Sequence, residues 1–267
     1  MRSLMVADLR ARWRSLAGLG LGCLVVLLLI TGTYSGLGGR AGVTRSFGSG
    51  TPAKMMSAIS GSPSADIAVP ANYIGFSFSH PLFLLLSITV AVSSGVGAIA
   101  ADVESGRAEM LYTAPVSRTA VLGARLVGWL IAQTSVLACA VAGALIGSRL
   151  SSDLSEASAW VPLQLAVQFG ALSFFFAAAS FAASARAQTR GAALGAATAI
   201  AAGSYVANLV ALLWHPLHVL RRLNPFGYYN ATAAADHIQW LDALALITSG
   251  TLLLIVSRIW LENRDLT

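Results

Sequence analysis

The sequence predicts an all-α integral membrane protein with six transmembrane helices and a short helix on the inner side between the second and the third. Hydrophobic residues make up 56% of its 267 residues, charged residues only 10%, and the mean hydropathy is +0.72. An apolar run of about 20 residues suffices to cross a hydrocarbon core of about 30 Å. Six such runs cover roughly residues 16–36, 81–101, 119–147, 160–183, 191–213 and 240–260. We therefore expect residues 1–267 to form one transmembrane domain.

The first apolar run has the flanks of either a signal peptide or a retained helix. Arg10, Arg12 and Arg14 precede it, and small residues follow it. The run is longer than a signal-peptide core of about 7–15 residues. Because five further apolar runs follow, we expect this segment to remain as the first transmembrane helix.

The basic residues predict the orientation of the six helices, since Lys and Arg accumulate in cytoplasmic loops. With the N-terminus inside, eleven basic residues lie on the inner side and six on the outer side. The inner set is Arg2, Arg10, Arg12, Arg14, Arg107, Arg118, Arg125, Arg186, Arg190, Arg258 and Arg264. The outer set is Arg40, Arg45, Lys54, Arg149, Arg221 and Arg222. Both termini are therefore expected in the cytoplasm, and the chain in the cell (plasma or cytoplasmic) membrane.

Two longer segments are expected on the outer side. Residues 37–79 are rich in Gly, Ser and Pro, which favours loop with one short helix near residues 53–60. Residues 214–239 combine aromatic residues, Pro and Arg, a composition typical of a segment that lies at the interface or dips back into it.

The sequence lacks the residues that several functional classes require. A P-loop needs a Gly-rich turn that ends in Lys, and the only lysine, Lys54, has no such context. The centres of the apolar runs hold no ionisable residue, so no proton relay is indicated. Cys23 and Cys139 fall within predicted helices, and the four histidines form no ligand set, so we expect neither a disulfide nor a metal site. Attraction to anionic lipid explains the net charge of +6 without a nucleic-acid partner.

The inner stretch of residues 101–118, ADVESGRAEMLYTAPVSR, is the chemically distinctive part of the chain. Asp102, Glu104 and Glu109 cannot enter hydrocarbon, and Pro115 stops a helix before the third span begins. These features predict a short amphipathic helix across the cytoplasmic face. A solvated turn whose charges only avoid lipid is the simpler alternative.

This arrangement resembles the permease subunits of type-2 ABC exporters, and the resemblance extends over most of the chain. Those permeases carry an inner helix with Glu, Gly, Glu-plus-aliphatic and Pro-Val/Ile-Ser-Arg, matched by Glu104, Gly106, Glu109, Met110, Leu111, Pro115, Val116, Ser117 and Arg118. Their outer Asn/Ser-Pro-Phe-x-Tyr-Tyr segment is matched by Asn224, Pro225, Phe226, Tyr228 and Tyr229. Their frequent Arg-Asp-Leu ending is similar to Arg264, Asp265 and Leu266.

The resemblance implies a coupling helix that docks on a separate ATP-binding subunit. The residues that it assigns to this contact are Asp102, Glu104, Gly106, Glu109, Met110, Leu111, Pro115, Ser117 and Arg118. If residues 101–110 are helical, Glu104 and Glu109 lie about 140° apart around the axis, and only one of them is expected to dock. Arg118 is expected to bind lipid headgroups or a carboxylate.

The outer segment has two interpretations. The resemblance implies an outer gate or re-entrant element formed by Asn224, Pro225, Phe226, Tyr228 and Tyr229. The preference of aromatic side chains for the membrane interface is the alternative explanation.

The resulting hypothesis is a permease that forms the translocation path of an ATP-driven exporter and is not itself an enzyme. ATP and Mg²⁺ are expected on the partner subunit, and this chain is expected to pair with a second copy or a sister permease through its first or fifth span. A drug, an antibiotic or another amphipathic molecule is the expected cargo. An ATP-independent carrier or a structural membrane partner is the alternative, and a membrane-embedded enzyme lacks the clustered polar residues that it would need.

Overall fold

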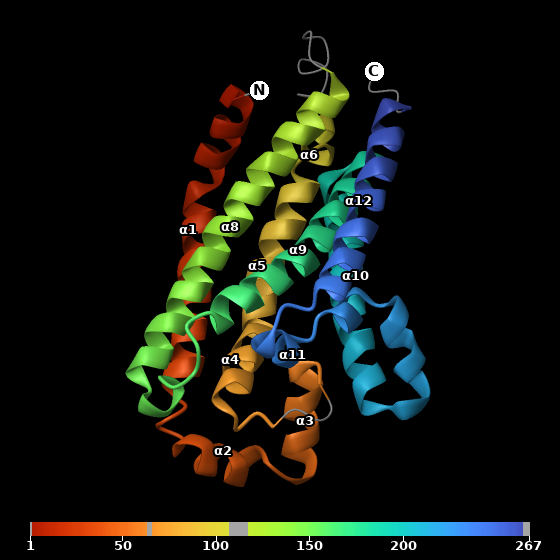
Figure 1. Ribbon diagram of the computed structural model, residues 1–267. Helices are drawn as coiled ribbons and strands as arrows, with labels where there is room; N and C mark the ends of the chain where they lie inside the picture. The colour runs from red at the N-terminus through yellow and green to blue at the C-terminus, as the bar shows by residue number, and fades with distance from the viewer. Residues whose placement is uncertain (1, 63–65, 107–116, 264–267) are drawn as a thin grey trace.

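A computed structural model describes residues 2–62, 66–106 and 117–263, and these ranges contain helices and no strand (Figure 1). Five long helices are α1 (Arg2–Gly32), α8 (Arg118–Leu150), α9 (Val161–Arg186), α10 (Arg190–Leu213) and α12 (Trp240–Glu262). The shorter elements are α2 (Gly39–Phe47), α3 (Gly50–Ser60), α4 (Pro70–Ser79), α5 (Pro81–Val96), α6 (Ala100–Glu104), η1 (Ser152–Leu154), η2 (His215–Leu223), η3 (Pro225–Tyr228) and α11 (Ala231–Asp236).

Within the described ranges, five candidate transmembrane helices match expected runs, and the second run, expected over residues 81–101, overlaps a sixth candidate that is bent. α1 from Arg10, α8, α9, α10 and α12 are each long and apolar enough to cross a bilayer. The sixth candidate is a bent pair, α4 and α5, whose axes meet at 49° around His80. α5 alone has 16 residues, fewer than the about 20 that a span needs, so the pair reaches the length of a sixth span only when α4 is counted with α5.

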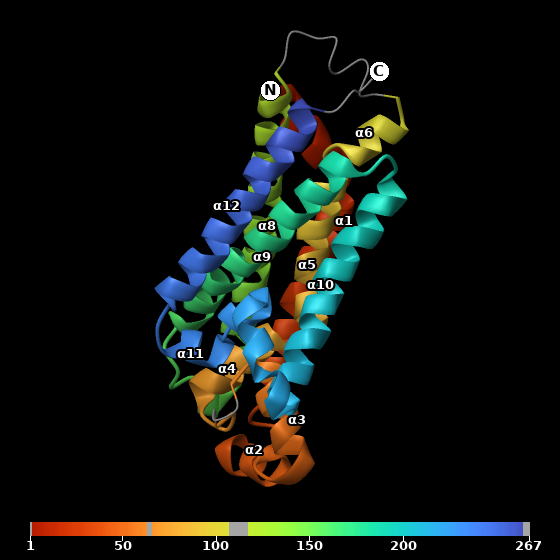
Figure 2. The same cartoon turned by 90° about the vertical axis from the view of Figure 1, so that its right-hand side faces the viewer.

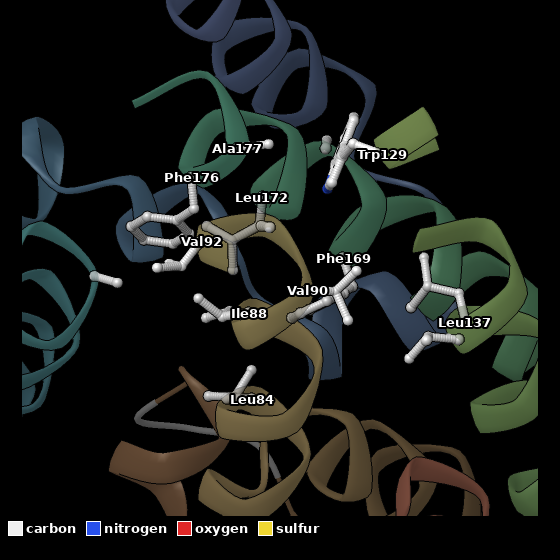
Figure 3. Packing of buried hydrophobic residues seen from close by; sticks show 14 of the residues in the cluster. Leu84, Ile88, Val90, Val92, Trp129, Leu137, Phe169, Leu172, Phe176 and Ala177 are labelled. Atoms are coloured by element: carbon white, nitrogen blue, oxygen red, sulfur yellow. The ribbon is translucent and has the colours of Figure 1, made fainter. Parts of the chain in front are cut away.

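Helix α9 occupies the centre of the bundle and contacts α5, α8, α10, α11 and α12. Its apolar stretch is 72% buried, compared with 22% for α10 and α12. Figure 3 shows Phe169, Leu172 and Phe176 of α9 beside Val90 and Val92 of α5. Phe169 and Phe176 are therefore packing residues of the core.

Helices α1 and α8 approach each other closely along a seam of glycines. A Cβ atom built on Gly143 would lie 2.2 Å from the carbonyl oxygen of Leu24, and one on Gly147 would lie 2.7 Å from that of Leu28. The two glycines are four residues apart and share one face of α8, the small-xxx-small pattern of close helix contacts in membranes. Larger residues at these positions would push the two backbones apart.

The segment of residues 37–79, which was expected to be loop with one short helix, contains three helices. α3 covers the expected helix near residues 53–60, but α2 and α4 were not expected. α4 is buried from Tyr73 to Ser79 and packs against α11 and α9. Its Gly75 allows the backbone of Ala231 to come so close that an added Cβ would lie 2.8 Å from that carbonyl oxygen.

The start of α1, α6, the start of α8 and the end of α12 lie at one end of the bundle, called here the α6 end (Figures 1 and 2). α2, α3, α11 and the η2–η3 segment lie at the opposite end. Because an even number of spans returns the chain to its starting side, this arrangement agrees with six crossings.

Candidate functional site

Helix α6 is the described part of the stretch that the sequence assigns to coupling. Ser184 of α9 fixes its beginning, since the Ser184 hydroxyl oxygen accepts the backbone N–H of Ala100 at 2.9 Å and donates to the carbonyl of Val96 at 3.1 Å. The helix has five residues and ends at Glu104. Gly106 follows with φ +69°, a left-handed conformation that favours glycine and ends the helix.

The condition of one continuous helix over residues 101–110 is not met, because α6 ends at Glu104 and Gly106 is left-handed. The angle of about 140° between Glu104 and Glu109, which assumed that helix, has no basis in this backbone. Glu109, Met110, Leu111 and Pro115 lie outside the described residues, as do Val116 and the C-terminal Arg264, Asp265 and Leu266.

Asp102 connects α6 to α8 through a buried ion pair. Its carboxylate lies 2.8 Å from the Arg125 guanidinium, and the two side chains are 8% and 17% exposed. Removing one partner of such a pair costs about 3–5 kcal/mol because the other charge stays desolvated. Asp102 thus stabilises α6 on the bundle, and it presents little carboxylate surface to an outside partner.

Glu104 connects α6 to the first residue of α10. Its Oε2 atom accepts the backbone N–H of Arg190 at 2.6 Å, although the two residues are 86 positions apart. The first N–H groups of a helix have no acceptor within the helix, and they carry a partial positive charge. A carboxylate therefore suits this position. In the same turn, the hydroxyl oxygen of the N-cap residue Thr189 accepts Ala192 N–H at 3.2 Å.

Ser117 and Arg118 begin α8 at the same end of the bundle. The Ser117 hydroxyl oxygen caps α8 by accepting Ala120 N–H at 3.2 Å. The Arg118 guanidinium donates to the carbonyl oxygens of Leu261 and Glu262 at 2.6 and 3.1 Å. A cation at the C-terminal carbonyls of a helix is favourable. Arg118 thus fixes the end of α12, and its expected contact with lipid headgroups or a carboxylate stays a prediction.

The outer aromatic segment is held against α4, α9 and α10. Asn224 donates to the carbonyl of Ser204 on α10 at 2.7 Å and accepts Phe226 N–H at 3.0 Å. The Tyr229 hydroxyl donates to the carbonyl of Phe78 at 3.1 Å, where α4 approaches its bend.

The remaining residues of this segment complete its attachment. Pro225 is the first residue of η3, and Gln168 of α9 donates to the carbonyl of Tyr228 at 3.3 Å. The buried Phe226 ring lies 5.3 Å from that of Phe176. A gating role for Asn224 to Tyr229 stays a prediction.

An apolar groove of about 390 Å³ separates α5 from α10. Ile88 and Val92 line it from α5, Thr198 and Ala202 from α10, and Phe226 from η3. Its volume falls within the range of about 300–1,000 Å³ found for sites that hold small molecules. Figure 2 shows α10 running along α5 at one edge of the bundle.

Comparison with known protein families assigns the chain to one of them. A family model described as ABC-2 family transporter protein matches residues 3–259. The chain therefore belongs to this family, a class of ABC transporter permeases, and is a multi-pass membrane protein of membrane transport. Searches of curated proteins and of solved structures gave no match.

Sequence reasoning missed the partners of the coupling stretch. Arg125 and Arg190 were considered only as basic residues of the inner side, and Ser184 and Thr189 were given no role. Arg190 follows Thr189, an N-cap residue type before an Ala-rich apolar run, so the start of α10 was readable. Its contact with Glu104 was not, because it depends on how two distant ends of helices meet.

Proposed function

We propose that this chain is the permease subunit of an ATP-driven exporter and forms half of its translocation path. The groove between α5 and α10 is the observation that carries the proposal. It extends from Pro81 to Ser93 of α5, about 18 Å at 1.5 Å per residue, and its wall is largely apolar. Such a surface suits a drug, an antibiotic or another amphipathic molecule.

A second copy or a sister permease completes the path against α10. Gly191, Gly195 and Gly203 of α10 are exposed, and a Cβ added to any of them would meet nothing within 4 Å. Of the three α1 glycines expected at the seam, Gly18 is as open as those of α10, whereas Gly20 and Gly22 face Cys139 and Leu86 of the same chain, at 3.2 and 3.1 Å from an added Cβ. The close approach of a partner therefore fits α10 better than α1.

The α6 end faces the cytoplasm in this proposal and receives the ATP-binding subunit, which holds ATP and Mg²⁺. The positive-inside rule supports this orientation, because the start of α1, the start of α8 and the end of α12 carry most of the inner basic residues. Gly106, the exposed Ser117 and the residues between them, including Glu109 to Leu111 and Pro115, form the docking surface. Asp102, Glu104 and Arg118 hold that surface on the bundle.

Purification of the tagged chain from its native membrane tests the proposal. We expect a complex with two permease chains and two copies of an ATP-binding protein, and its ATP turnover should rise with an amphipathic cargo. Gly195→Leu should dissociate the permease pair, whereas Gly123→Leu should not, although Gly123 of α8 also has nothing within 4 Å of an added Cβ.

A single permease chain that transports cargo without an ATP-binding protein would refute the proposal. It would favour the alternative, an ATP-independent carrier. A single chain with neither partner nor transport would favour a structural membrane role.

A further inference from the structure

Helix α6 is fastened to three neighbouring helices by contacts of unequal strength. Its start is bonded to Ser184 of α9, and Asp102 is paired with Arg125 of α8; both contacts are buried. Its end is bonded to α10 through Glu104, and this contact is exposed to solvent. A displacement of α6 would therefore strain the α10 contact first.

Helix α10 is held lightly on the side that faces the bundle. Its buried residues over the first three turns are alanines, Ala193, Ala197 and Ala201, which interlock little with their neighbours. The groove of about 390 Å³ lies between this helix and α5. The N-terminal end of α10 can thus shift relative to α5 without breaking a densely interdigitated core.

The Glu104 contact is a specific hydrogen bond that joins α10 to α6. A hydrogen bond of 2.6 Å from Arg190 N–H to a carboxylate oxygen is short, as charge-assisted bonds are. It adds to the favourable placement of a negative charge at a helix N-terminus. Thr189 already accepts Ala192 N–H in this turn, so the specific contribution of Glu104 is to join this turn to α6.

We propose that Glu104 is a positioning residue that fixes the N-terminal end of α10 to α6, so that movement of α6 changes the width of the α5–α10 groove. Glu104 then acts on the path through α10 and does not itself dock on the ATP-binding subunit. The attachment is a property of this chain alone, whereas its meaning for transport rests on the proposed function.

Spin-label distances in the full-length chain test the attachment without any ATP-binding protein. Cys23 and Cys139 are replaced by Ala, and labels are placed at Gln188, two residues before α10, and at Val127, exposed on α8. The labelled protein is diluted with unlabelled protein in lipid nanodiscs, so that only distances within one chain contribute. We expect one narrow Gln188–Val127 distribution, and its loss in Glu104→Ala in favour of a broad distribution with a second maximum.

Matched variants separate positioning from general stability. Thr189→Ala removes a cap from the same turn but leaves the link to α6, so it should keep the narrow distribution. Glu104→Gln keeps an acceptor and should largely restore it, whereas Glu104→Asp withdraws the carboxylate by one methylene and should broaden it. A reference pair at Val127 and Ile255, on α8 and α12, should stay unchanged in every variant.

A narrow distribution in both Glu104→Ala and Glu104→Asp would overturn the proposal. Equal broadening by Thr189→Ala would overturn it too, because α10 would then respond to any loss of capping. If Glu104→Ala fails to fold, Glu104→Asp and Glu104→Gln decide the matter. Failure of an ATP-binding protein to co-purify would instead refute the proposed function and leave these distances as they are.

Discussion

Replacing Gly143 by Ala should separate α1 from α8. The added Cβ would lie 2.2 Å from the carbonyl oxygen of Leu24 and 2.9 Å from its Cα, so it falls 1.2 Å short of the 3.4 Å at which ordinary contact begins. Both atoms belong to the α1 backbone and cannot rotate away. Overpacking of this kind costs about 1–3 kcal/mol.

Gly123→Ala is the matched control, because Gly123 lies on the same helix and an added Cβ there would meet nothing within 4 Å. Both variants gain the same helix propensity, up to about 1 kcal/mol, so their difference isolates the clash. Reversible unfolding in mixed micelles, followed by circular dichroism, should show Gly143→Ala less stable than Gly123→Ala by about 1–3 kcal/mol. Equal free energies of unfolding would refute the close α1–α8 seam.

Two further predictions concern topology and the buried ion pair. A cysteine at Ser62 should react with an impermeant reagent from outside, and one at Ser105 only after permeabilisation; the reverse pattern would place the α6 end outside. Asp102→Ala should lower the free energy of unfolding by about 3 kcal/mol, since Arg125 keeps its charge in a largely buried position. Arg258→Ala breaks an ion pair of the same 2.8 Å length between side chains 55% and 45% exposed, and it should change stability little. Similar losses in the two variants would contradict this account of burial.

The long helices were predictable because a bilayer demands length and apolarity, and both are visible in the sequence. The bounds of α8, α9, α10 and α12 fall within a few residues of the predicted runs. α4 was missed because its ten residues are too few for a span, and its buried environment is created by α11, far along the chain.

For the candidate site, the sequence predicted a set of residues but not the contacts of those that the structure describes. The charges around Glu104 predicted a stretch excluded from lipid, and motif resemblance gave that stretch a function. Neither observation predicts that Asp102 is buried against Arg125 or that Glu104 meets α10. By contrast, Gly143 and Gly147 form a G-x-x-x-G pattern in the sequence, and this signal could have predicted the α1–α8 seam.

Helix α4 and its packing partner α11 are synthesised far apart in time. α4 ends at Ser79, and α11 begins at Ala231, 152 residues later. At about 5–20 residues per second, the ribosome needs about 8–30 s to reach the partner helix. During this interval α4 has its earlier neighbours α1, α5 and α9, but the face that packs on α11 lacks its partner. The packing around α4 is therefore complete only when translation of the chain is nearly finished.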